Sequence, residues 1–334
     1  MRKCLALFDV SPFIYTGENV PAMRGSVKNF PTGGTKYFLN HLSHELASGS
    51  DVILCFDSSS FRKNLLPRYK SNRSPKPDII AQLDMLNKFL SRVGICCLKS
   101  DGYEADDLIY TCVEMFRESY IKIKIYTADY DIAHNVSETV EFLGVNSNVL
   151  DVNVNNFQAV LGVPYNTITA SKLFYGDKSD NIPTIGPNAG KYFDIYLEGI
   201  KECEDTPAII TRTREFMDLM LNVYYPEFIT NDEVEKIRNR IDLVYPKIVD
   251  FGYDFCPTNL STMSVHGYVS LLTTLNCSVA LQRLDFAPTD IDKELDSYLR
   301  EIGTTLSRGT YLVDNNIVNS CDKMDLGSFL MKGF

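Results

Sequence analysis

The chain has 334 residues, 45% of them hydrophobic, which is enough to bury a substantial core in roughly two domains. Its formal charge of −10 at pH 7 excludes a uniformly basic surface. Binding to nucleic acid would therefore require a local segment of positive charge. The nine cysteines contain no CxxC pair, so we expect reduced thiols and no structural zinc site.

The N-terminal apolar run is predicted to be a β-strand and not a signal peptide, because Asp9 interrupts it early. No later segment is apolar over the length of a membrane span. We therefore expect a soluble protein of the cytoplasm with no membrane partner.

Short β-rich runs alternate with helical patterns in the first half of the chain. Strands are predicted to begin at Cys4, Val52, Val93 and Ile123. Helices are predicted over residues 36–47, 79–93 and 108–116. This alternation predicts an α/β fold with a parallel sheet flanked by helices, and the pattern beyond residue 140 predicts a mainly helical second region.

Acidic residues follow each predicted strand. They are Asp9 after the first, Asp57 after the second, the cluster at Glu104 after the third, and Asp129 with Asp131 after the fourth. Because the carboxyl ends of parallel strands meet at one edge of a sheet, we expect these carboxylates to lie together. For residues 101–107 an alternative is that acids cap the first turn of a helix, and Asp101 fits that alternative.

A further acidic pair, Asp177 and Asp180, has the spacing of one face of a helical turn. Nine carboxylates are then candidates for one site: Asp9, Asp57, Glu104, Asp106, Asp107, Asp129, Asp131, Asp177 and Asp180. So many like charges are tolerated together only with cations between them. Hard oxygen ligands favour Mg²⁺, for which Mn²⁺ can substitute, and a pair of such ions about 4 Å apart splits phosphodiester bonds.

Basic residues are concentrated in residues 61–77, which contain no acid. They are Arg62, Lys63, Arg68, Lys70, Arg73 and Lys76, and the aromatic residues Phe61 and Tyr69 lie among them. A mixture of basic and aromatic side chains is typical of nucleic-acid binding, and the alternative is a solvated basic loop.

Five sequence blocks occur in an order that resembles the 5′-nuclease family, which contains flap endonucleases and the 5′-3′ exonuclease domain of bacterial DNA polymerase I, together with phage enzymes of the RNase H type. The blocks are FDVS, CFDSSSFRKNLLPRYKSNR, GYEADDLI, TADYDIAHNV and LGVPYNTITASKLFYGDKSDNIP, within residues 5–191. The resemblance implies a PIN-like nuclease domain over 1–180 with a helical arch at about 58–100. It also implies a mainly helical DNA-binding region over 181–302 and a tail over 303–334.

The resemblance also implies roles for individual residues. The first metal ion would be served mainly by Asp9, Asp57, Glu104, Asp106 and Asp107, the second by Asp131, Asp177 and Asp180, with Asp129 between them. The resemblance implies that Asp106, Asp129, Lys70 and Arg73 are catalytic residues. Lys70 and Arg73 would contact the scissile phosphate. Tyr69 would stack on a base, and Gly33, Gly34 and Thr35 would start a helix near the DNA backbone.

Several segments depart from the family pattern. Ala128 and Tyr130 stand where relatives have glycine and a basic residue, so the loop that carries Asp129 and Asp131 is expected to differ in shape. Gly186, Gly190 and Lys191 resemble a helix-hairpin-helix turn that binds DNA through K⁺, although the glycines are displaced.

The C-terminal residues Leu326, Phe329 and Leu330 resemble the apolar anchors of peptides that dock on sliding clamps. Lys323 replaces the usual glutamine. The alternative is a tail that packs on its own domain.

These features predict a metal-dependent 5′-3′ exonuclease or flap endonuclease that removes RNA primers or 5′ flaps during DNA replication and repair. Its expected partners are DNA with a 5′ end or flap, an RNA–DNA hybrid, and a sliding clamp or single-strand-binding protein. We expect a monomer in a bacterial or phage-infected cytoplasm. The alternatives are a non-catalytic DNA-binding replication factor, and a haloacid-dehalogenase-type phosphatase, which is disfavoured because Ser11 occupies the position of the second aspartate.

Overall fold

The structure of the protein is a computed structural model. It describes residues 4–74, 76–165, 167–184, 186, 189–199, 215 and 240–309, and the backbone of residues 312–313 and 316–317. The chain divides into two compact units, each discontinuous in sequence. The first comprises Met1–Pro12, Glu45–Ser74 and Gly94–Met263, and the second Phe13–His44, Pro75–Val93 and Ser264–Phe334. The domain boundaries inferred from the family resemblance stay predictions.

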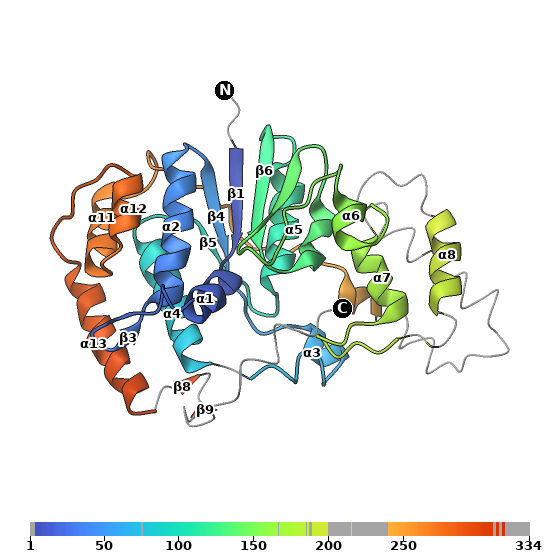
Figure 1. The fold of residues 1–334 in the computed structure, drawn as a ribbon, viewed down its shortest axis with the longest axis horizontal. Helices are drawn as coiled ribbons and strands as arrows, with labels where there is room; N and C mark the ends of the chain where they lie inside the picture. Colours follow the sequence, from blue (N-terminus) through green and yellow to red (C-terminus); the bar gives the residue numbers. More distant parts are fainter. Residues whose placement is uncertain are drawn as a thin grey trace. The chain divides into compact units, whose positions relative to one another are not determined.

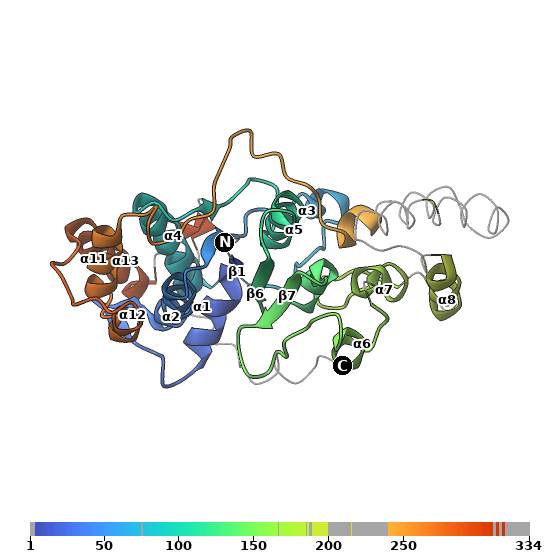
Figure 2. The same ribbon diagram turned by 90° about the horizontal axis from the view of Figure 1, so that it is seen from above.

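A five-stranded sheet forms the centre of the first unit (Figure 1). In spatial order its strands are β5 (Cys97–Leu98), β4 (Asp51–Cys55), β1 (Cys4–Asp9), β6 (Lys122–Thr127) and β7 (Val140–Gly144). Every neighbouring pair is parallel. Figure 2 shows β1, β6 and β7 side by side in this spatial order. The predicted α/β fold with a parallel sheet is therefore confirmed.

Two strands differ from the sequence prediction. β7 is absent from it, because this edge strand is short and buries only its alternate residues Val140 and Phe142. The run that starts at Val93 forms a strand only at its end, since Val93 still caps helix α4 (Pro77–Arg92). Gly94, with a φ of +90°, then turns the chain.

Helix α5 (Ala105–Phe116) covers part of the sheet in the first unit, where it contacts β1 and β4. Its apolar residues Leu108, Ile109 and Cys112 share a buried cluster with Leu7 and Ile53 of those strands. Among the described residues of this unit the other helices are α3 (Arg62–Leu65), the 3₁₀-helix η1 (Tyr130–Asn135), α6 (Phe157–Leu161), α7 (Ile168–Tyr175) and α8 (Ala189–Gly199). Burial of the face of α5 fixes the direction in which its N-terminus points.

The second unit is built from helices and two short hairpins. Its helices are α4, α11 (Val265–Thr274), α12 (Ser278–Arg283) and α13 (Lys293–Ser307), and α1 (Val10–Asn19) and α2 (Gly33–Ala47) lie mostly in it. The hairpins pair β2 (Ser26–Val27) with β3 (Phe30–Pro31), and β8 (Leu312–Val313) with β9 (Asn316–Ile317). Helix α13 packs on α4 and β3, with the rings of Phe89 and Tyr298 in an edge contact at 5.4 Å.

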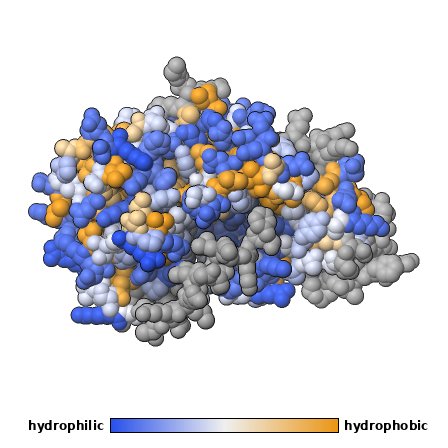
Figure 3. Space-filling model, viewed as in Figure 1, coloured by the Kyte–Doolittle hydropathy of each residue, from blue (hydrophilic) through white to orange (hydrophobic). Residues whose placement is uncertain are grey.

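Hydrophilic residues are interspersed with smaller hydrophobic groups over the face drawn in Figure 3. Among the residues that the structure describes, no helix is both long enough and apolar enough to cross a membrane.

Candidate metal and nucleic-acid site

Four neighbouring strands carry acidic residues at one edge of the sheet. Asp9 ends β1, Asp57 follows β4, and Asp129 follows β6. Glu104, after β5, caps the N-terminus of α5. Because the strand order is β5, β4, β1 and β6, the segments that carry these residues are neighbours, as the sequence predicts.

Asp9 lies at the centre of this edge. Its side chain is buried, and its Oδ2 accepts a hydrogen bond of 2.8 Å from Thr127 Oγ1. Its Oδ1 is also buried and has no hydrogen-bond partner among the described residues. Burial, together with the charges of Asp57, Asp129 and Asp106, holds the pKa of Asp9 well above its usual range. Such a carboxylate needs a proton or a cation beside it.

Asp57 and Asp106 lie close to Asp9 in this group. Asp57 is exposed, and its two oxygens accept hydrogen bonds from the Ala105 amide at 3.0 Å and from Ser11 Oγ at 2.7 Å. Burial, and next the charge of Asp107, hold the pKa of Asp106 well above its ordinary value. The backbone bond from Ala105 ties the loop after β4 to the start of α5.

Asp107 is bound to a cation of the protein itself. It is fully buried, and its oxygens accept hydrogen bonds of 2.8 Å from both terminal nitrogens of Arg62. It also accepts the amides of Glu104 and Lys247 at 3.1 and 2.9 Å. With its oxygens committed in this way, Asp107 does not fit the predicted role of a metal ligand. For this residue the helix-capping alternative holds.

Arg62 does not fit the predicted contact with DNA, because only 1% of its side chain is exposed. Besides Asp107 it contacts Glu104, at 3.0 Å, and donates to the carbonyl oxygens of Leu243 and Tyr245. A buried guanidinium with these partners holds α3, the start of α5 and residues 243–245 together. We therefore assign Arg62 to the framework of the site.

Glu104 is surrounded by hydrogen-bond donors. Its Oε1 lies 2.5 Å from Lys70 Nζ, and its Oε2 accepts from the Tyr69 hydroxyl at 2.9 Å and from Arg62. Burial alone would raise the pKa of Glu104, but the charges of Lys70 and Arg62 lower it below its ordinary value. Glu104 is therefore an ionised carboxylate that orients Lys70.

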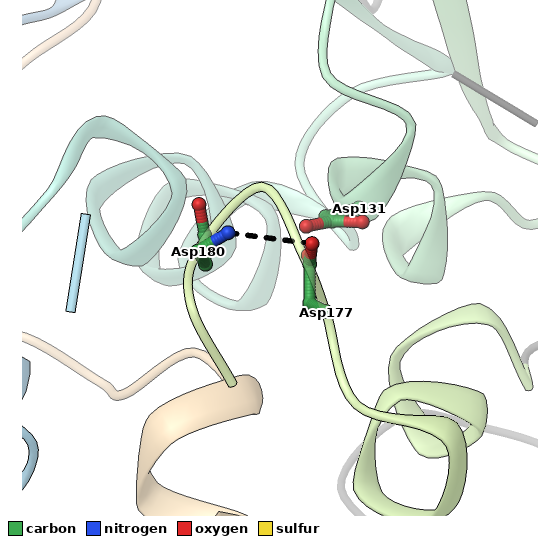
Figure 4. A group of neighbouring side chains, drawn as sticks. All are labelled: Asp131, Asp177 and Asp180. Carbon is green, nitrogen blue, oxygen red and sulfur yellow. Dashed lines mark hydrogen bonds between the residues drawn. The ribbon is translucent and has the colours of Figure 1, made fainter. Parts of the chain in front are cut away.

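A second acidic group consists of Asp131, Asp177 and Asp180 (Figure 4). Carboxylate oxygens of the three residues lie within 4.8 Å of one another. Asp177 and Asp180 belong to one loop, in which the Asp180 amide donates to Asp177 Oδ1 at 3.4 Å. Asp131 reaches the group from η1, and its carboxylate points toward Asp177.

Lys172 of α7, which is not among the residues predicted from the sequence, lies between two members of the second group. Its Nζ contacts Asp131 and Asp177. Burial, and next the charge of Asp129, raise the pKa of Asp131 to about 7, although Lys172 opposes that shift. For Asp177 burial would raise the pKa, but the charge and hydrogen bond of Lys172 and the hydrogen bonds of Ser179 together lower it. The ammonium of Lys172 shows that this group attracts a cation.

Two basic residues that follow α3, Lys70 and Arg73, reach the carboxylates, and their contact with a scissile phosphate stays a prediction. Lys70 Nζ lies 3.8 Å from Asp180, in addition to its contact with Glu104, and Arg73 contacts Asp180 at 2.7 Å. About half of the Arg73 side chain is exposed, so its remaining guanidinium hydrogens are accessible to an anion.

Tyr69 does not fit the predicted stacking on a base. Its ring is buried with Ile182 and Leu243, and its hydroxyl donates to Glu104 or, at 3.2 Å, to Asp180. Lys63 and Arg68 are exposed, as a nucleic-acid contact requires. Lys76, in the second unit, is half-buried with its Nζ 5.3 Å from the centre of the Tyr15 ring.

The glycine turn at the start of α2 does not fit the predicted contact with the DNA backbone. Gly33, Gly34 and Thr35 are buried. The amide of Gly34 donates to Glu18 Oε1 at 3.0 Å, and that of Thr35 to Gln82 Oε1 at 2.9 Å. These side chains satisfy the amides that would otherwise face a phosphate.

The predicted helix-hairpin-helix turn is described only in part. Gly190 and the exposed Lys191 lie in the first turn of α8, and Gly186 has a φ of +126°. Residues 185, 187 and 188, and the C-terminal anchors Leu326, Phe329 and Leu330, lie outside the described residues. The K⁺ contact and clamp docking therefore stay predictions.

The donor sets fit divalent metal ions. The buried, unpartnered oxygen of Asp9 and the acids around it form one set of hard oxygen ligands, and Asp131, Asp177 and Asp180 form a second. Both sets contain carboxylates that raise one another's pKa, which is the condition that bound cations relieve.

Comparisons with solved structures give matches of low similarity. The 5′-exonuclease of bacteriophage T5 with bound zinc ions matches with a TM-score of 0.49 and 15% identity, over 90% of this chain and 98% of that one. Human GEN1 in complex with Holliday junction DNA matches with a TM-score of 0.46 and 13% identity, over 94% of this chain and 76% of that one.

Sequence comparisons give closer relatives. A 5′-3′ exonuclease of Aquifex aeolicus is 30% identical over 191 residues, which are 55% of this chain and 65% of the relative. A 5′-3′ exonuclease of Bacillus subtilis is 31% identical over 163 residues, 46% of this chain and 55% of the relative. DNA polymerase I of Mycobacterium bovis is 32% identical over 180 residues, 52% of this chain and 20% of the relative. In each case the chain spans less than two thirds of the relative's own length.

A family model described as the 5′-3′ exonuclease N-terminal, resolvase-like domain matches residues 5–162. This segment contains the sheet except Cys4, the first residue of β1, and every acid of the site except Asp177 and Asp180. Residues 5–162 are therefore similar to the N-terminal domain of 5′-3′ exonucleases, and the relatives named above are 5′-3′ exonucleases and a DNA polymerase I.

Proposed function

We propose that the protein is a metal-dependent 5′-nuclease that hydrolyses phosphodiester bonds near 5′ ends or at the junctions of 5′ flaps in DNA. The observation that carries this proposal is that acids from four strands meet near Asp9, whose buried Oδ1 has no hydrogen-bond partner in the described part of the chain. When bound, two Mg²⁺ ions, or Mn²⁺ in their place, would lower the pKa of an attacking water and stabilise charge on the reacting oxygens.

The acids divide into two ligand sets under this proposal. The first set consists of Asp9, Asp57 and Asp106, the second of Asp131, Asp177 and Asp180, and Asp129 lies between them. Glu104 contributes by holding the ammonium of Lys70 through its hydrogen bond, in addition to any contact with a metal ion.

Lys70 and Arg73 supply the positive charge that a scissile phosphate requires. Both side chains already contact carboxylates of the site, so a phosphate held near those acids lies within their reach. Their donors would stabilise the charge that develops on the phosphate oxygens. The exposed Lys63 and Arg68, outside the acidic group, would contact the DNA backbone.

The proposed biological substrates are 5′ flaps and RNA primers. Relatives named 5′-3′ exonuclease and DNA polymerase I support a role in removing RNA primers or 5′ flaps during replication and repair. Residues 58–100, which contain α3, α4 and β5, would form the arch past which a single-stranded 5′ end is led. An RNA–DNA hybrid, a sliding clamp and K⁺ at the hairpin turn belong to the same proposal.

The proposal is tested with labelled duplexes that carry a 5′ flap, a 3′ flap or no flap. We expect cutting of the 5′-flap duplex near its junction with Mg²⁺ or Mn²⁺, products with a 5′-phosphate, and no cutting in EDTA. The 3′-flap duplex should stay intact. Tight binding of the 5′ flap without cutting in either metal would instead indicate a non-catalytic replication factor.

A further inference from the structure

Two loops of the first unit are joined beside the carboxylates. We call residues 68–73, which carry Lys70 and Arg73, the basic turn, and residues 177–182, which carry Asp177 and Asp180, the acidic loop. The Lys70 amide donates to the carbonyl oxygen of Asp180 at 3.3 Å. Asn72 Nδ2 donates to the carbonyl oxygen of Ser179 at 3.3 Å. The position of the basic turn therefore depends on the acidic loop.

The Asn181 side chain donates from the acidic loop to the backbone of the basic turn. Its side-chain Nδ2 donates to the carbonyl oxygen of Arg68 at 3.0 Å, and Ser71 Oγ and Asn72 Oδ1 lie 3.3 and 3.4 Å from the same nitrogen. The Arg68 carbonyl also accepts the Ser71 amide, which closes the basic turn. The amide group of Asn181 thus contacts the turn at the point where it folds back on itself.

The backbone on both sides of this junction is in the left-handed region. Asn181 has a φ of +59° and Lys70 a φ of +51°. Asparagine adopts this conformation more readily than most residues, whereas lysine does so rarely. Surrounding contacts must therefore hold Lys70 in place, and the hydrogen bonds from the acidic loop are among those contacts.

We propose that Asn181 is a positioning residue for the nuclease reaction. Its side chain fixes the basic turn on the acidic loop, so that Lys70 and Arg73 stand at a set distance from the carboxylates that hold the metal ions. This role rests on the proposed function. A displacement of about 1 Å in a catalytic group lowers a reaction rate by roughly 10²-fold, so the loss of one positioning contact is measurable.

The test separates the side chain of Asn181 from its backbone conformation. Asn181→Gly keeps the left-handed φ without its amide group, and Asn181→Ala loses both. Single-turnover cutting of a 5′-flap duplex with Mg²⁺ should fall by roughly 10- to 100-fold in both variants, while flap affinity stays unchanged. Asn276, between α11 and α12 in the second unit, has a φ of +56°, so Asn276→Ala introduces the same backbone strain without changing either of the two loops, and the variant should cut normally.

The dependence on Lys70 and Arg73 is measured directly. Asn181→Gly added to a Lys70→Ala, Arg73→Ala background should cause no further loss of cutting rate, because the side chains that it positions are already absent. A full additional loss in that background, or cutting at the wild-type rate by Asn181→Gly alone, would overturn the proposal.

A second readout does not require nuclease activity. Trypsin cleaves after Arg68, Lys70 and Arg73, and its rate on the native protein follows local opening of the basic turn. Cleavage at these sites, identified by mass spectrometry, should be faster in Asn181→Gly than in the wild type and in Asn276→Ala. If the wild type cuts no flap, the proposed function fails; equal trypsin cleavage in all three proteins would reject the role of Asn181 on its own.

Discussion

The guanidinium of Arg62 donates two hydrogen bonds of 2.8 Å to the carboxylate of Asp107, and both side chains are buried. Arg62 belongs to the basic segment that the sequence predicts to bind nucleic acid, and Asp107 to the acidic segment that it predicts to bind metal. Together they neutralise each other beneath the site. The remaining acids of the edge are thereby left to bind cations from solution.

Arg62→Met should destabilise the protein by about 3–5 kcal/mol, because it leaves the Asp107 carboxylate buried without its partner. Denaturant unfolding in EDTA measures the change. Lys63→Ala, at the exposed neighbouring position, should leave the unfolding midpoint unchanged. Adding Asp107→Leu to Arg62→Met should restore part of the stability, whereas an Arg62→Met protein that is fully stable and only binds DNA more weakly would contradict this assignment.

Asp9→Asn should raise the melting temperature of the metal-free protein near pH 8. The folded-state pKa of Asp9 lies above its ordinary value. The folded state therefore loses stability as the pH rises from the ordinary pKa through the folded-state pKa. The amide removes this loss and can still accept the bond from Thr127. The difference in melting temperature between Asp9→Asn and the wild type should shrink as the pH falls toward about 4, the ordinary pKa of a carboxyl group, because Asp9 is then protonated in the folded state.

Mg²⁺ extends the same measurement. Because the ion binds only the folded carboxylates, it should raise the melting temperature of the wild type more than that of Asp9→Asn. If Asp9→Asn were less stable than the wild type in EDTA at both pH 8 and pH 4, the Asp9 carboxylate would be stabilised by contacts within the protein and would not need a cation.

Lys172→Met should increase the affinity of the protein for Mn²⁺. The ammonium now lies between Asp131 and Asp177, where it competes with an added cation for the same oxygens. Calorimetric titration compares this variant with Lys178→Met, which removes an exposed lysine from the acidic loop. Unchanged or weaker Mn²⁺ binding in Lys172→Met would mean that the lysine supports the metal site and does not compete with it.

Lys70→Ala should lower the single-turnover rate of flap cutting by roughly 10²- to 10³-fold at saturating DNA, because it removes a donor from the developing charge. Lys63→Ala should behave differently. It should weaken flap binding and reduce its salt dependence, with an unchanged rate at saturation. Equal effects of the two changes on rate and affinity would refute separate roles for these lysines.

The sheet and the edge that carries the acids could be predicted from the sequence, because strand ends in a parallel sheet share one edge whatever the loops do. Asp9, Asp57 and Asp129 follow buried strands and therefore required no knowledge of tertiary contacts. The apolar period of α5 likewise predicted the helix that presents Glu104.

The sequence could not show which charges pair inside the protein. Arg62 and Asp107 are far apart in the chain, and a basic residue has the same appearance in a sequence whether its partner is a carboxylate or a phosphate. Lys172 was missed for the same reason, since its helix places it near Asp131, a residue from another segment. The period-two pattern of Val140 and Phe142 was the available signal for β7, but it spans too few residues to stand out.

The most direct test of the account is cutting of a labelled 5′-flap duplex by four proteins with Mg²⁺ and with EDTA: the wild type, Asp129→Asn, Asp177→Asn and Asp101→Asn. Asp101 is exposed and is assigned no part in the metal site, so it serves as the matched control. We expect Mg²⁺-dependent cutting by the wild type and by Asp101→Asn, and no cutting by Asp129→Asn or Asp177→Asn. Wild-type cutting rates in Asp129→Asn and Asp177→Asn would contradict the metal-dependent nuclease proposed here.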